Sequence, residues 1–164
     1  MIASQGSPAL EGLVSVGAFH VGIEVPDIDE GLRFYRDVLG FEEAWRINPG
    51  SGELLDRITG IRGLDETAVV QLVVPGGVRL ELQQYKPQGT VGACEVNNQG
   101  INHLSFGVPN VRAAYERLSA AGVKFRSEPV DMPDGLEVLP DGWAVVYFED
   151  PWGTVLELLG PSNG

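Results

Sequence analysis

The stretch FHVGIEVP at residues 19–26 returns in pattern as NHLSFGVP at residues 102–109. Each stretch carries a histidine, His20 or His103, six residues before the closing proline, and the chain has no other histidine. In the first stretch apolar residues alternate with other types, which is the pattern of a strand with one buried face. The sequence therefore predicts a repeated strand whose histidine points away from the apolar side.

A second pair of stretches repeats in the same way, PGGVRLEL at residues 75–82 and PWGTVLEL at residues 151–158. Glu81 and Glu157 each stand between two leucines, so alternation turns each carboxylate away from the apolar face. One such polar residue alone is typical of a solvated strand face. Glutamate has poor strand propensity, however, so folding gives no reason to keep it in both repeats. The recurrence favours one divalent metal between two modules, with the ligands His20, Glu81, His103 and Glu157.

The composition is that of an acidic globular chain of 164 residues, with a net charge of −12 and 43% hydrophobic residues. Such a charge argues against nucleic-acid and anionic-membrane partners, which require clusters of Lys and Arg. It does not exclude an anionic small molecule that meets a few arginines. Cys94 is the single cysteine, so no intrachain disulfide can form and a cytoplasmic location is expected. No apolar run approaches the length of a membrane span.

The order of patterns predicts an α+β chain. We expect a flexible leader at 1–16, a first module at 17–88, a linker at 89–100 and a second module at 101–160. Each module has the pattern strand, helix, strand, strand, strand, and one such unit would expose an apolar sheet face, so two must pair to close a core. The expected strands are 17–25, 41–47, 67–74, 78–85, 101–108, 123–128, 143–149 and 154–159.

Helices are expected between these strands. The first begins near Asp27 or Asp29 as its cap and ends at Gly40, and the second spans about 110–121. The segment 49–66 is expected to hold a short helical turn, and 129–142 to be a loop.

Arg79 and two tryptophans each leave two interpretations open. Arg79 shares the face of Glu81 and either neutralises it or meets substrate, the first being favoured. Tyr35 is expected in the helix core. Trp143 and Trp152 either pack in the core or line a pocket.

In the repeated stretches that carry the histidines and glutamates, the chain resembles the vicinal oxygen chelate superfamily. That group includes glyoxalase I, methylmalonyl-CoA epimerase, extradiol dioxygenases, and the fosfomycin and bleomycin resistance proteins. The resemblance covers about residues 17–160, and its marks are HVGI at 20–23, FYRDVLGF at 34–41, HLSF at 103–106, and DPWG at 150–153 with Glu157. It implies two paired βαβββ modules that form a cup-shaped mixed sheet around a metal site, and a homodimer.

Departures from the family patterns narrow the choice of activity within the superfamily. Extradiol dioxygenases resemble this chain from Tyr147 onward, but they also place a catalytic histidine shortly before that tyrosine, where this chain has VLPDG at 138–142. A fourth ligand at Glu81 would also crowd dioxygen chemistry. The full His-Glu-His-Glu set of this chain resembles that of glyoxalase I. Methylmalonyl-CoA epimerase is similar but usually carries Gln at the position of Glu81. Glu24 stands where glyoxalase I tends to place an arginine for the glutathione carboxylate, and an acid there would repel glutathione.

The resemblance therefore implies a metal-dependent isomerase or lyase of the glyoxalase or acyl-CoA epimerase type, acting on a small-molecule carbonyl substrate. Its reaction would be proton abstraction next to a carbonyl polarised by Ni, Co, Mn, Fe or Zn. Glu157 is the first candidate for the base and Glu81 the second. The alternative is a resistance-type protein that binds a small molecule such as an antibiotic in the same cup, and an extradiol dioxygenase is less favoured. The sequence leaves open the substrate, the metal, and whether the site forms within one chain or across a dimer.

Overall fold

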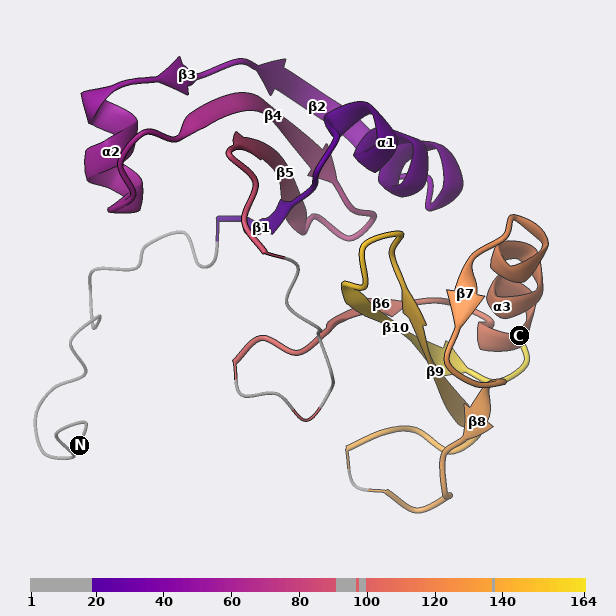
Figure 1. Cartoon of the computed structure of the whole chain (residues 1–164). Helices are drawn as coiled ribbons and strands as arrows, with labels where there is room; N and C mark the ends of the chain where they lie inside the picture. Colours follow the sequence, from indigo (N-terminus) through magenta and orange to yellow (C-terminus); the bar gives the residue numbers. More distant parts are fainter. Residues whose placement is uncertain (1–18, 91–96, 98–99, 137) are drawn as a thin grey trace, which may run out of the picture.

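Two mixed β-sheets, one from each half of the chain, carry the fold (Figure 1). The structure is a computed structural model that describes residues 19–90, 97, 100–136 and 138–164. The expected leader 1–16 and most of the expected linker 89–100, with Cys94, lie outside the described residues. Within the described residues, two sheets with few helices confirm the predicted α+β class.

The two sheets have the same strand order in space. In sequence order, the first sheet contains β1 (Val21–Glu24), β2 (Glu42–Ile47), β3 (Gly50–Ser51), β4 (Asp65–Val73) and β5 (Arg79–Lys86). The second contains β6 (Leu104–Gly107), β7 (Lys124–Phe125), β8 (Val130–Asp131), β9 (Trp143–Glu149) and β10 (Val155–Pro161). The spatial order is β1-β5-β4-β2 in one sheet and β6-β10-β9-β7 in the other, with β3 and β8 paired to β4 and β9.

Most strands agree with prediction, and the differences are local. The strands expected to carry the histidines are shorter than expected and begin directly after them, at Val21 and Leu104, and the strand expected at 123–128 is only Lys124–Phe125. The short strand β8 lies inside the segment expected to be a loop.

The first helix differs from prediction in its type. α1 (Ile28–Leu32) starts at its cap Asp27, whose carboxylate accepts hydrogen bonds from the Asp29 and Glu30 amides at 3.0 and 2.9 Å. It then continues as a π-helix, η1 (Arg33–Val38), and ends at Gly40, whose φ of +82° suits glycine. The expectation of a single α-helix is therefore wrong for its second half.

The other helices follow the sequence pattern. α2 (Glu53–Thr59) is the helical turn expected within 49–66, and α3 (Val111–Ala120) is capped by Asn110. No helix in the described part of the chain is long and apolar enough to cross a membrane.

A single hydrophobic core joins both modules. Leu80 and Leu82 on the first sheet and Phe148 and Leu156 on the second are fully buried members of the same cluster. Across the junction, the rings of Phe41 and Phe106 lie 5.3 Å apart. Each sheet thus buries one face, and its other face is free to present polar side chains.

Candidate metal centre

Each module sets its histidine beside its glutamate through the same strand pairing. β1 runs parallel to β5 with Val21 opposite Leu80, and β6 runs parallel to β10 with Leu104 opposite Leu156. In the first module His20 directly precedes Val21, and Glu81 directly follows Leu80. In the second module His103 directly precedes Leu104, and Glu157 directly follows Leu156. The repeat in the sequence is therefore also a repeat in space.

The histidine and glutamate side chains of each module face one another. His20 Nε2 lies 3.7 Å from Glu81 Oε1, and His103 Nε2 lies 3.6 Å from Glu157 Oε2. The carboxylates are 13% and 11% exposed, and the imidazoles are 37% and 30% exposed. Two ligands about 2.0–2.2 Å from one cation lie roughly 3–3.5 Å apart, so small side-chain movements would let each pair share a metal. Below, His20 with Glu81 is the first half-site, and His103 with Glu157 is the second half-site.

Asn102 sets the tautomer of His103. The Nδ1 atom of His103 lies 2.7 Å from Asn102 Oδ1, and an amide oxygen only accepts, so the ring proton is on Nδ1. The Nε2 lone pair is then left facing Glu157, as a metal ligand requires. Sequence reasoning missed Asn102, whose one signal is its place directly before His103.

Tyr147 is the polar partner of Glu157. The two residues stand opposite one another in the β9–β10 register, and the Tyr147 ring meets His103 edge-on at 5.3 Å. Burial raises the pKa of Tyr147, and the charge of Glu157 and a hydrogen bond to it raise it further. The phenol therefore remains a donor to this carboxylate. Alternation along one strand could not reveal this contact, because it depends on the pairing of two strands.

Glu81 has a different partner. The Gln83 amide donates to Glu81 Oε1 at 3.3 Å and to Glu66 Oε1 at 3.1 Å, which ties the half-site to a second, buried carboxylate. Gly22 leaves room for this arrangement, because a Cβ atom there would lie 3.0 Å from Gln83 Oε1. The two glutamates occupy equivalent positions in the repeat, yet an amide holds one and a phenol holds the other.

Arg79 does not take the favoured role of neutralising Glu81. Its Nη1 donates to Gln71 Oε1 at 3.4 Å, and its guanidinium carbon lies 5.1 Å from the centre of the Phe19 ring. Of Trp143 and Trp152, Trp152 packs against the core, which is one of its two expected roles.

The two half-sites do not meet within one chain. Among the residues that the structure describes, no three His, Cys, Asp or Glu side chains come close enough to hold one metal ion. Each module thus provides a pair of donors, and the structure does not gather all four residues.

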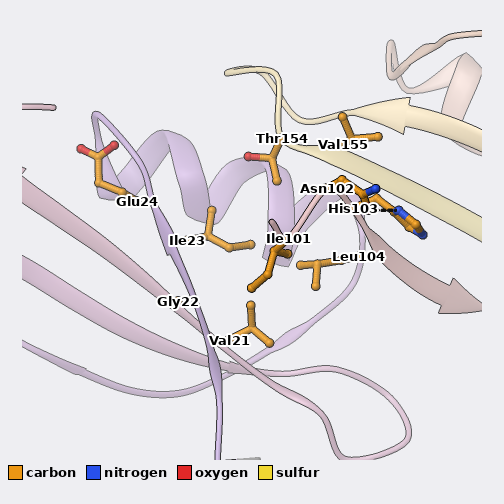
Figure 2. A pocket seen from close by; sticks show the side chains of 10 residues that line it. All are labelled: Val21, Gly22, Ile23, Glu24, Ile101, Asn102, His103, Leu104, Thr154 and Val155. Carbon is orange, nitrogen blue, oxygen red and sulfur yellow. Dashed lines mark hydrogen bonds between the residues drawn. The ribbon is translucent and has the colours of Figure 1, made fainter. Parts of the chain in front are cut away.

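A hollow of about 260 Å³ lies where β1 approaches β6 (Figure 2). Figure 2 shows Glu24 and His103 on opposite sides of it, with Val21 and Leu104 between them. Of the four predicted ligands, only His103 is in its lining. The residues that line the hollow are Val21, Gly22, Ile23, Glu24, Ile101, Asn102, His103, Leu104, Thr154 and Val155.

Comparison with known proteins finds relatives of this chain. The sequence profile of the Glyoxalase/Bleomycin resistance protein/Dioxygenase superfamily matches residues 17–158. A 2-epi-5-epi-valiolone epimerase from an Actinomyces species is 31% identical over 153 residues, covering 92% of this chain and 82% of that protein. A probable lactoylglutathione lyase from a Synechocystis strain is 28% identical over 144 residues, covering 88% of this chain and 95% of that protein.

Solved structures share the fold. A glyoxalase family protein from Bacillus cereus superposes with a TM-score of 0.70 at 23% identity, covering 86% of this chain and 91% of that one. A fosfomycin resistance protein from Listeria monocytogenes superposes with a TM-score of 0.56 at 16% identity, covering 90% and 94%. At these identities the likeness bears on the fold alone.

Proposed function

The chain belongs to the glyoxalase/bleomycin resistance protein/dioxygenase superfamily, and from that membership we propose that it is a metal-dependent isomerase or lyase. In this proposal the enzyme removes a proton from the carbon next to a substrate carbonyl. The relatives named as an epimerase and as a probable lyase support this reaction class.

The observation that carries the proposal is the equal geometry of the two half-sites. A single His–Glu pair on a strand face would be unremarkable, but here the same strand offset yields nitrogen-to-oxygen distances of 3.7 and 3.6 Å in both modules. Two imidazoles and two carboxylates are a mixed donor set that suits Ni, Co, Mn, Fe or Zn.

A second copy of the chain would complete the donor set. We propose a homodimer in which the first half-site of one protomer meets the second half-site of its partner. The support is that each half-site offers two donors and has a partly exposed imidazole. In a two-fold dimer the same contact occurs twice, so the assembly would hold two equivalent centres.

The residues divide the chemistry between them. A divalent cation in this set would supply Lewis acidity toward the substrate carbonyl. His20 and His103 serve as neutral ligands, and the Glu157 carboxylate accepts the proton from carbon and returns it. The Tyr147 hydroxyl orients Glu157 for this transfer. Glu81, held by the Gln83 amide, is the second candidate for the base.

The test is complementation between two inactive variants. His20→Ala and His103→Ala are purified separately, stripped of metal, mixed at equal amounts to exchange subunits, and dialysed against Ni, Co, Mn or Zn salts. Each variant alone should hold little metal. In a mixed dimer one of the two shared centres is intact, so random mixing should restore about a quarter of the wild-type sites.

Elemental analysis gives the metal content, and proton-to-deuterium exchange of carbonyl substrates in deuterated water gives the reaction. Restored metal in the mixture supports the shared centre. Full metal content in each variant alone would refute the ligand assignment, and no restoration on mixing would refute the shared centre. Glu116→Gln, on an exposed position of α3, is the matched control and should behave as wild type.

A second candidate is a protein that binds a small molecule without turning it over. It is favoured by the hollow of about 260 Å³ between β1 and β6, whose lining is largely apolar. Wild-type protein that takes up no metal under any of these conditions, but that carries a tightly held organic molecule through purification, would select this candidate.

A further inference from the structure

The face of the first sheet that carries Glu81 also carries several other polar side chains. Along β5, Gln83 and Tyr85 follow Glu81 at intervals of two and so share its face. In the neighbouring strand β4, Gln71 stands opposite Glu81 and Glu66 opposite Tyr85. With Glu24 of β1, we call Glu24, Glu66, Gln71, Gln83 and Tyr85 the polar face.

Gln71 contributes a donor that the described residues leave unused. The residue is 2% exposed, and its Oε1 accepts from Trp45 Nε1 at 3.1 Å and from Arg79 Nη1 at 3.4 Å. Because two donors hold the oxygen, the orientation of the amide is fixed. Its Nε2 is buried and has no hydrogen-bond partner among the described residues. Buried donors are nearly always paired, so this N–H points to an acceptor that a ligand would bring.

Two exposed side chains bond this amide. Trp45 is 38% exposed, and Arg79 is also exposed. Both donate to the Gln71 oxygen, so they hold the amide in the orientation that leaves Nε2 to a ligand.

The rest of the polar face is negative. Burial raises the pKa of Tyr85 well above its usual range. A hydrogen bond to Glu66 and the charges of Glu66, Glu81 and Glu24 raise this pKa further. Three carboxylates therefore act on one phenol, which stays protonated and able to donate. Arg79, which contacts Gln71 and Phe19, offsets only part of the negative charge of the three carboxylates.

Such a face suits some ligands and excludes others. Carboxylates accept hydrogen bonds from hydroxyl groups, and each has about four lone-pair sites, so Glu66 can accept from a ligand as well as from Gln83. Ligands with phosphate or carboxylate groups would meet like charge, which disfavours them strongly in a partly covered site.

We propose that the polar face binds the hydroxyl groups of the substrate, which is then an uncharged carbonyl compound bearing several hydroxyls. Gln71 Nε2 donates to one substrate oxygen, and Glu24 and Glu66 accept from its hydroxyl groups. The word substrate here rests on the proposed function, whereas the hydroxyl binding rests on the polar face alone.

The experiment uses metal-loaded, full-length protein and three probes. They are 2-keto-myo-inositol, which is neutral and polyhydroxylated; cyclohexanone, which lacks the hydroxyls; and the hemithioacetal of methylglyoxal and glutathione, which is anionic. Calorimetric titration gives each dissociation constant, and deuterium exchange followed by NMR gives turnover. We expect the keto-inositol to bind at least about tenfold more tightly than either of the others.

Two variants test the named residues. Gln71→Leu removes the free N–H and should weaken keto-inositol binding about tenfold while leaving cyclohexanone binding unchanged. Glu24→Arg, at an exposed position, should weaken the keto-inositol and strengthen the hemithioacetal. Glu116→Gln is the control for a lost surface carboxylate and should change neither. If Gln71→Leu does not fold, Glu24→Arg decides.

The outcomes separate this inference from the proposed function. Equal binding of keto-inositol and cyclohexanone, or preference of the wild type for the hemithioacetal, overturns the hydroxyl-binding face. Keto-inositol binding that depends on Gln71 and Glu24, without deuterium exchange of any probe, upholds the face and rejects the isomerase. Exchange of the hemithioacetal alone rejects the face and upholds the isomerase.

Discussion

The Tyr35 hydroxyl donates a buried hydrogen bond of 2.8 Å to the carboxylate of Asp150, 115 positions later in the chain. Tyr35 belongs to the π-helix of the first module, and Asp150 to the turn between β9 and β10 of the second. The same carboxylate accepts the backbone amides of Trp152 and Thr154 at 2.9 and 2.7 Å. One side chain of the DPWG segment therefore shapes its own turn and joins the two modules.

Tyr35→Phe should destabilise the protein without changing its fold. The substitution removes a hydrogen bond to a charged, 4% exposed acceptor, which costs about 1.5–3 kcal/mol of unfolding free energy. Urea denaturation followed by tryptophan fluorescence measures the loss. Tyr115→Phe is the matched control, because the Tyr115 hydroxyl has no hydrogen bond within the described part of the chain, and it should cost much less. Equal losses in the two variants would show that the bond to Asp150 contributes nothing.

The alkaline limit of stability should depend on the same hydroxyl. Burial raises the pKa of Tyr35 well above its usual value, and the charge of Asp150 and the bond to it raise it further. The unfolded chain ionises this tyrosine near pH 10 while the folded chain keeps it neutral, so stability present below about pH 10 falls as pH rises beyond it. Urea midpoints between pH 8 and 11 should fall more steeply for wild type than for Tyr35→Phe. Parallel curves would contradict the raised pKa.

Gly160→Ala should be strongly destabilising. A Cβ atom at Gly160 would collide with the backbone carbonyl of Val108, which a side-chain rotation cannot relieve. Overpacking of this kind costs about 1–3 kcal/mol or more. Gly107→Ala, on the neighbouring strand β6, is the control, since a Cβ there meets nothing within 4 Å. Thermal unfolding of both variants checks the difference, and a normal melting temperature for Gly160→Ala would refute the close approach.

Glu157→Gln should separate metal binding from turnover. The amide keeps an oxygen donor of the same reach but cannot accept the substrate proton, so metal content should persist while turnover falls about 10²–10⁴-fold. Deuterium exchange per bound metal is the measurement, and Glu81→Gln is the comparison. Wild-type turnover in Glu157→Gln, with loss in Glu81→Gln, would move the role of base to Glu81.

Much of the fold was predictable because local periodicity carries it. Alternation around His20 and Glu157 gave the strands and their buried faces, and glycines such as Gly40 gave the helix ends. The pairing of Tyr147 with Glu157 was not predictable, because alternation specifies a face but no cross-strand partner. The same limit hid Gln71, although a single amide inside the run AVVQLVV at 68–74 is unusual in an apolar strand. The separation of the two half-sites depends on how the modules pack, which no local pattern specifies.

The π-helix can be traced to a difference of one residue between the repeats. Between the Val-Pro that closes the first strand and the glycine that ends the helix, the first module has residues 27–39 and the second has residues 110–121, one residue fewer. The longer segment holds η1, and the shorter one holds the regular helix α3. A single insertion absorbed as a wider turn accounts for this difference, and it lies in the segment that carries Tyr35. Because of this insertion the two modules cannot replace one another. A chain assembled from two copies of the second module would lack the tyrosine that joins the modules.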